Sequence, residues 1–257
     1  MVGPALIAVR SKSATTTKRF MNLLLLAAFV GLLPMVAGAS EFARQLPRVF
    51  LLGDSISIQY GPALESYLQG VADYDRKRDG DTDRAAADLD LPQGANGGNS
   101  ARLLAYLKAR RANGGIPADW LVFNCGLHDI KTDPVTGRPQ VVLGQYKENL
   151  RACLAEARAM HLRAIWINIT PIMEDRHNQL RTDFKRFTRD IDAYNAAADR
   201  IMREAAVPVI DLHGFSMRLI PAGLADHVHF NESAQHLQAA FIAGSLRVLL
   251  YPSTPNP

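Results

Sequence analysis

The segment Arg48-Val49-Phe50-Leu51-Leu52-Gly53-Asp54-Ser55 decides the fold class of this chain. Its apolar run stops at a glycine, which is typical of a strand that is buried on both faces. Strands of that kind belong to parallel sheets whose two faces are covered by helices. The segment therefore predicts a central parallel strand, followed by a turn that carries Asp54 and Ser55.

Similar apolar runs recur along the chain and alternate with helical patterns. Further strands are expected at residues 71–74, 120–124, 164–169 and 207–210, and helices at residues 100–112, 142–160, 187–205 and 233–250. This alternation predicts an α/β fold in which a parallel sheet has helices on both faces. Two polar stretches interrupt this alternation. Residues 76–99 are expected to form a long loop with an insertion, and residues 174–185 a loop that borders the substrate cleft. A mobile surface loop is the alternative for both stretches.

The segment from Met1 to Ala39 does not fit this pattern. An apolar run from Phe20 to Leu33 ends in Ala37-Gly38-Ala39, and it is preceded by the basic residues Arg10, Lys12, Lys18 and Arg19. This order predicts a secretory signal peptide that is cleaved near Ala39, and hence an exported (periplasmic or secreted) protein. A membrane anchor is the alternative, but the run is shorter than the roughly 20 residues that a bilayer span needs. Residues 40–257 are then expected to form one domain with no stable membrane insertion, ending in a disordered tail at residues 252–257.

Removal of the signal peptide changes the charge of the protein. The whole chain has 29 Lys and Arg, 25 Asp and Glu and a net charge of +4. The segment from Met1 to Ala39 holds four of the basic residues and no acidic one, so the remainder has 25 of each sign. The basic isoelectric point of about 9.2 therefore comes from the signal peptide, and the sequence gives no indication of nucleic-acid binding.

The two cysteines, Cys125 and Cys153, are too few for a disulfide framework even in an oxidising compartment. One lies in an apolar strand pattern and the other on a predicted helix. We expect both to be buried free thiols, because neither has the neighbours of a metal ligand or of a reactive thiol.

Ser55 is the first candidate for a catalytic residue. Ligands of open parallel α/β sheets bind outside the carboxyl ends of the strands, and Ser55 follows the first strand at such an end. Backbone N–H groups and the dipole of a following helix can stabilise an oxyanion there. A Gly-Asp-Ser tripeptide is weak by itself, because Ser55 could also be a simple helix cap.

A second group of candidates lies in the segment Asp226-His227-Val228-His229-Phe230, just before the last helix. A serine nucleophile needs a base within hydrogen-bond reach and a carboxylate that orients this base. With a spacing of three residues on a loop, Asp226 can lie beside the ring of His229 while that ring faces Ser55. The alternative is a metal site on His227 and His229 with His128 or Asp129 as a third ligand, which would make the Ser55 pattern a coincidence.

Four segments in order resemble the conserved blocks of the SGNH hydrolase superfamily, the GDSL-like serine esterases. They are Gly53-Asp54-Ser55, Asn96-Gly97-Gly98-Asn99-Ser100, Gly126-Leu127-His128-Asp129, and Asp226 with His229. The third block is similar to that of a bacterial branch with a Gly-Leu-His-Asp segment. Together the blocks cover the chain from about Arg48 to Leu250.

This resemblance implies a flavodoxin-like three-layer sandwich with a five-stranded parallel sheet, and a serine esterase mechanism without a metal or another cofactor. Ser55 would be the nucleophile, His229 the base and Asp226 its orienting acid. The oxyanion hole would consist of the backbone N–H groups of Ser55 and Gly97 and the side chain at position 128, with Gly98 and Gly94 as other candidates for the glycine. The family has an asparagine where this chain has His128, and a neutral imidazole can also donate one N–H.

The reaction expected from these residues is hydrolysis of a carboxylic ester through an acyl-enzyme. The substrate would be a small-molecule or carbohydrate ester, such as an O-acetyl group on a sugar. An O-acyltransferase, in which a sugar hydroxyl replaces water, uses the same chemistry and remains an alternative. A catalytically silent binding domain is a further alternative, against which the complete set of candidate residues argues.

Overall fold

A computed structural model describes residues 45–78, 89 and 91–252 of the chain. The predicted signal peptide, residues 253–257 of the predicted tail, and residues 79–88 and 90 of the expected insertion lie outside the described residues.

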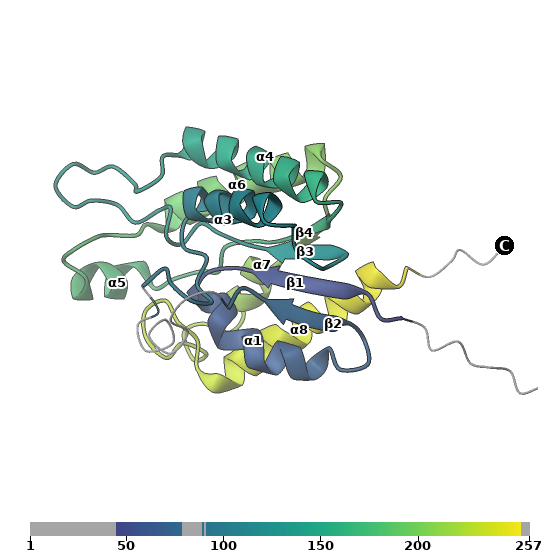
Figure 1. Cartoon of the computed structure of the whole chain (residues 1–257). Coiled ribbons are helices and arrows are strands. Elements are labelled where there is room, and N and C mark those ends of the chain that lie inside the picture. Colours follow the sequence, from purple (N-terminus) through teal and green to yellow (C-terminus); the bar gives the residue numbers. More distant parts are fainter. Residues whose placement is uncertain (1–44, 79–88, 90, 253–257) are drawn as a thin grey trace, which may run out of the picture. The chain divides into compact units, whose positions relative to one another are not determined.

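The described residues contain a five-stranded parallel sheet with the strand order β2-β1-β3-β4-β5 (Figure 1). The strands are β1 (Arg48–Leu52), β2 (Asp73–Arg76), β3 (Trp120–Phe123), β4 (Arg163–Ile167) and β5 (Val209–Ile210). All four pairings are parallel. The strand order confirms the predicted flavodoxin-like fold, in which the first strand lies inside the sheet.

Helices cover both faces of the sheet (Figure 1). One layer consists of α3 (Ser100–Ala112), α4 (Leu143–Ala159) and α6 (Thr188–Glu204), and the other of α1 (Ser55–Tyr67), α7 (Leu212–Met217) and α8 (Glu232–Leu250). The short helix α5 (Glu174–Leu180) lies beyond the carboxyl ends of the strands. Among the described residues, no helix is long and apolar enough to cross a membrane.

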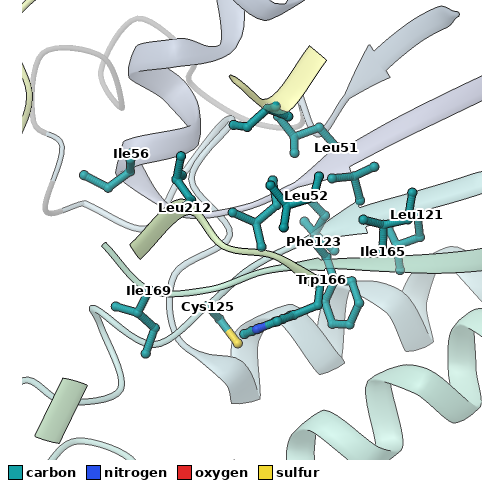
Figure 2. Close-up of a cluster of buried hydrophobic side chains, with 14 of the residues drawn as sticks. Leu51, Leu52, Ile56, Leu121, Phe123, Cys125, Ile165, Trp166, Ile169 and Leu212 are labelled. Atoms are coloured by element: carbon teal, nitrogen blue, oxygen red, sulfur yellow. The ribbon is translucent and has the colours of Figure 1, made fainter. Parts of the chain in front are cut away.

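The core explains why the apolar runs become strands. Val49 to Leu52 of β1 and all of β3 are buried, because helices pack on both faces of these strands. Phe123 and Trp166 meet edge to face with their ring centroids 5.0 Å apart (Figure 2), a favourable geometry for aromatic pairs. Cys125 lies in the same buried cluster, and both cysteines are free and buried, as the sequence predicts.

The four long predicted helices are present with their ends within one residue of expectation. Strand β2 begins two residues later than predicted, and β5 is reduced to two residues. The polar segment 174–185, expected to be a loop, forms α5 over its first seven residues. These differences arise where the local apolar pattern is short or absent, so that tertiary contacts decide the structure.

Candidate active site

Ser55 is the first residue of α1, directly beyond the carboxyl end of β1. Asp54 caps the helix, since its Oδ1 accepts a hydrogen bond of 3.1 Å from the Ile56 N–H. Gly53 has no side chain at a point where a Cβ atom would lie 2.2 Å from Oδ1 of Asn124. This close approach of β1 and β3 makes the turn tight and leaves Ser55 buried at the positive end of a helix.

A buried arginine holds the first turns of α1 in place. Arg76, at the end of β2, donates from Nη1 to the Ser57 carbonyl oxygen (2.8 Å) and from Nη2 to the Ser57 Oγ (3.2 Å). Gly61 leaves the space that this guanidinium occupies, because a Cβ atom there would lie 2.1 Å from Nη1. The position of Ser55 therefore depends on β2, the edge strand that pairs with β1.

Ser55, His229 and Asp226 form a continuous line of contacts. Nε2 of His229 lies 3.3 Å from Oγ of Ser55, and Nδ1 lies 2.8 Å from Oδ2 of Asp226. A carboxylate can only accept, so Nδ1 carries the proton in this contact and Nε2 is left to accept from the serine hydroxyl. This is the arrangement that serine hydrolysis requires of a nucleophile, a base and an orienting acid.

The carboxylate of Asp226 is held in its ionised form. Burial alone would raise its pKa, but hydrogen bonds from the His229 ring and from the N–H groups of His229 (2.7 Å) and Val228 (2.6 Å) outweigh burial and lower the pKa well below its usual range. Asp226 is thus negatively charged at neutral pH, as a residue that stabilises an imidazolium must be.

A glutamine on α1 connects this loop to the nucleophile's helix. Gln59 donates from Nε2 to the Phe230 carbonyl oxygen (3.1 Å) and accepts at Oε1 from the Phe230 N–H (3.2 Å). Phe230 directly follows His229 and is fully buried. The pair of hydrogen bonds fixes the distance between the helix that carries Ser55 and the loop that carries His229.

The glycines of the second block lie beside the first block, Gly53-Asp54-Ser55. The Gly97 N–H donates to the Gly53 carbonyl oxygen (2.7 Å), and the Gly98 N–H donates to Oδ1 of Asn96 (2.9 Å). Both amides are therefore engaged within the protein in this conformation. The Ser55 N–H differs from these two amides. An N–H in the first turn of a helix has no carbonyl acceptor four residues earlier within that helix.

The third block forms a buried turn after β3. His128 is 3 % exposed, and the neighbouring Asp129 accepts hydrogen bonds from the Ser100 N–H (2.9 and 3.0 Å) and from the Ser100 hydroxyl. Burial raises the pKa of Asp129 to about 7, against the lowering effect of the bonds from Ser100. Arg186, only 2 % exposed, donates from Nε to the Leu127 carbonyl oxygen (2.8 Å) and so supports the same turn.

The two histidines of the last block face different partners. Nδ1 of His227 lies 2.9 Å from Nδ1 of His177 on α5, whereas His229 faces Ser55 and Asp226. Burial lowers the pKa of His227, and the positive charges of Arg186 and other neighbours add to this effect. Within the described residues, no group of three His, Cys, Asp or Glu side chains could hold a metal ion. The metal alternative therefore has no geometric support in this part of the chain.

Sequence reasoning did not identify four residues that support the site: Gln59, Arg76, His177 and Arg186. Each acts through a contact with a residue far away in the chain. No local pattern predicts such contacts.

A buried serine at a helix start, with a histidine and an aspartate aligned on it at the carboxyl edge of a parallel sheet, is characteristic of the serine hydrolases. The comparisons with known proteins identify the family. The profile of the GDSL-like Lipase/Acylhydrolase family matches residues 51–237. The chain belongs to this family and is a serine-type ester hydrolase.

Solved structures share this fold. A lipase/acylhydrolase from Enterococcus faecalis has a TM-score of 0.56 and 17% identity, over 81% of this chain and 100% of that one. The acetyl xylan esterase AlAXEase has a TM-score of 0.56 and 14% identity, over 77% and 99% of the two chains. An acetylxylan esterase from Geobacillus stearothermophilus, solved as a catalytic mutant, has a TM-score of 0.56 and 18% identity, over 82% and 98%. No curated protein matches the chain in sequence.

Proposed function

We propose that this protein hydrolyses carboxylic esters with Ser55 as nucleophile, His229 as general base and Asp226 as the acid that orients the base. The observation that carries the proposal is the line of contacts from Oγ of Ser55 through the His229 ring to Asp226, at 3.3 and 2.8 Å.

In the first half of the reaction, Nε2 of His229 takes the hydroxyl proton of Ser55 as Oγ attacks the ester carbonyl carbon. The tetrahedral intermediate collapses when His229 gives this proton to the leaving alcohol, and the acyl group stays on Ser55. In the second half, His229 removes a proton from water, the hydroxide attacks the acyl carbon, and the proton returns to Oγ. A carboxylic acid leaves, and Asp226 keeps its negative charge throughout.

The oxyanion that forms in both halves needs donors at the positive end of α1. We assign the Ser55 N–H and the His128 side chain to this role. The Gly97 N–H is the third donor of the proposed hole, and it would have to exchange its bond to Gly53 for one to the oxyanion.

For the substrate, we propose an O-acyl ester, in particular an acetyl group on a carbohydrate. Two of the structural neighbours bear the name acetyl xylan esterase, and the export predicted from the segment Met1 to Ala39 would bring the enzyme to extracellular polysaccharide. An acyltransferase on the same residues would give a transferred acetyl group instead of acetate when a sugar acceptor is added.

The decisive experiment combines a covalent label with a pair of serine variants. A fluorophosphonate should label the protein on the peptide that contains Ser55, and Ser55→Ala should lose both the label and nearly all turnover of p-nitrophenyl acetate. Loss of a serine nucleophile has cost about 10⁶ in kcat in a serine protease. Ser245→Ala is the matched control, because this hydroxyl donates to the Phe241 carbonyl oxygen (2.8 Å) within α8 and its loss should leave turnover unchanged.

Retained turnover in a folded Ser55→Ala variant, or a label on another serine, would refute the assignment.

A further inference from the structure

Three cations surround the ring of Phe184, in the segment between α5 and α6. Nζ of Lys131 and the guanidinium carbon of Arg181 lie 4.4 Å from the ring centroid, and the guanidinium carbon of Arg186 lies at 4.9 Å. All three charges therefore lie within about 10 Å of one another, a distance over which like charges repel near a protein surface. The aromatic ring offsets part of this repulsion through cation–π contacts. We call Lys131, Arg181, Phe184 and Arg186 the cationic cluster.

Rings in direct contact connect the cationic cluster to the proposed catalytic loop. The centroid of Phe184 is 5.5 Å from that of His177, which is 4.6 Å from that of His227. His227 immediately follows Asp226 in the chain. The positive charges of Arg181 and Arg186 both lower the pKa of His227, as expected for cations close to this loop.

The cationic cluster also contacts the turn that carries His128. Arg186 donates to the Leu127 carbonyl oxygen (2.8 Å), and the Lys131 N–H donates to the His128 carbonyl oxygen (3.3 Å). A backbone bridge between Thr132 and Lys185 joins the two segments that contribute the cations. The cluster thus belongs to the segments that follow β3 and α5, and α5 lies beyond the carboxyl ends of the strands (Figure 1).

The segment around Phe184 carries a small excess of positive charge. Residues 40–257 carry 25 basic and 25 acidic side chains, whereas residues 174–190 carry five basic and four acidic ones, to which Lys131 adds a further positive charge. Asp183 pairs with Arg181 at 2.8 Å, which reduces the excess of positive charge without cancelling it. A local excess of one sign beside a reactive group attracts substrates of the opposite sign.

We propose that the cationic cluster binds an anionic group, a carboxylate or a phosphate, in the part of the substrate that does not react. The proposal rests on the proposed function, and it narrows the substrate from esters in general to esters that carry a negative charge. Lys131 and Arg181 are half-buried and are assigned to bind the anion, because their side chains are accessible. Arg186 is buried and is assigned to position the turn of His128 and to add its charge.

Three acetate esters that differ in charge test this assignment: phenyl acetate, 4-acetoxybenzoate and 4-acetoxyphenyl phosphate. The Lys131→Gln/Arg181→Gln variant should raise KM for the two anionic esters by about tenfold or more, since hydrogen bonds to charged groups are worth roughly that factor. Its kinetic constants for phenyl acetate should stay unchanged. The two anionic esters distinguish a carboxylate from a phosphate as the preferred group.

The control is Arg158→Gln, which removes one charge from an exposed position in the last turn of α4, near the amino end of β4. This variant should leave the kinetic constants for all three esters unchanged.

Salt at about 0.5 M should reduce the preference of the wild type for anionic esters and leave the hydrolysis of phenyl acetate unchanged.

A second measurement separates recognition from catalysis. Ser55→Ala protein should bind 4-acetoxybenzoate or 4-acetoxyphenyl phosphate more tightly than phenyl acetate, and the same protein with Lys131→Gln and Arg181→Gln should not. Equal KM changes for charged and neutral esters, or no difference in binding, would overturn the anion site while leaving ester hydrolysis intact. Absence of any Ser55-dependent hydrolysis would instead refute the proposed function, and the binding comparison would still decide the anion site.

Discussion

The aspartates of the site show how the surroundings shift the pKa of one residue type in opposite directions. Asp226 receives hydrogen bonds from a ring and two backbone N–H groups, and its pKa is lowered despite partial burial. Asp54 and Asp129 are fully buried, and burial raises the pKa of each. The orienting carboxylate is thus the one whose charge the protein stabilises, whereas the other two serve as a helix cap and as an acceptor for Ser100.

His128 gives the first prediction at this scale. A donor to the oxyanion acts mainly in the transition state, so its loss lowers kcat and leaves KM nearly unchanged. We expect His128→Ala to lower kcat for p-nitrophenyl acetate by about 10² to 10³, the cost of removing one such donor elsewhere. His128→Asn should recover part of the loss, because an amide can also donate.

Thermal unfolding of both His128 variants provides the control. If His128 only satisfies buried backbone groups near its turn, the alanine variant has a lower melting temperature and the folded fraction keeps its kcat. A folded His128→Ala protein with normal kcat would remove His128 from the oxyanion hole.

At the scale of elements, the start of α3 and the turn after β3 are joined through Asp129. This carboxylate accepts from the N–H and the hydroxyl of Ser100, and Asn149 of α4 donates to the same hydroxyl (2.9 Å). The network fixes the second and third blocks relative to each other, and with them the residues around Ser55. Its only titratable member is Asp129, so the junction depends on pH.

The pH dependence has a definite sign. The pKa of Asp129 is about 7 in the folded protein and 3.8 as the ordinary value, so the folded state binds more protons between these pH values. Stability from this group is fully present below about pH 4 and is lost as the pH rises towards 7, by at most about 1.4 kcal/mol per pH unit. Asp129→Asn cannot titrate, so its free energy of unfolding should fall less over this range than that of the wild type.

Denaturant unfolding at several pH values between about 4 and 7 measures this difference. Parallel curves for the two proteins would show that Asp129 does not change its protonation in this range.

The elements also show what sequence can and cannot predict. Strands such as β1 and β3 and the four long helices were predictable, because their burial leaves an apolar pattern in the sequence. For helix α1 only a start near Ser55 was predicted, without an end, since Gly61 and Pro62 lie within it and both are unfavourable in helices. The contact of Gly61 with Arg76 explains this glycine, but it involves a separate strand, β2, that follows later in the chain.

The same distinction applies to the candidate site. The site at the carboxyl edge of the sheet was predictable for Ser55 from its position directly after β1. The pairing of Asp226 with His229 was predictable from their spacing of three residues on the loop before the last helix. The engagement of the Gly97 N–H by Gly53 could not be foreseen, since it depends on how closely two backbones approach. The catalytic roles remain proposals that rest on the geometry.

At the scale of the whole molecule, we propose that the protein is exported and that its mature form begins at or near Ser40. The segment from Met1 to Ala39 has the basic, apolar and small-residue order of a signal peptide, and it contains four basic and no acidic residues. Its removal takes the formal net charge at pH 7 from +4 to zero. The isoelectric point should therefore fall from about 9.2 to near neutrality.

Both properties can be measured after expression of the full-length chain in a bacterium. The periplasmic and medium fractions are analysed by amino-terminal sequencing and by isoelectric focusing. A cytosolic product that keeps Met1 and focuses at basic pH would contradict export. A near-neutral protein that begins at Ser40 would support it.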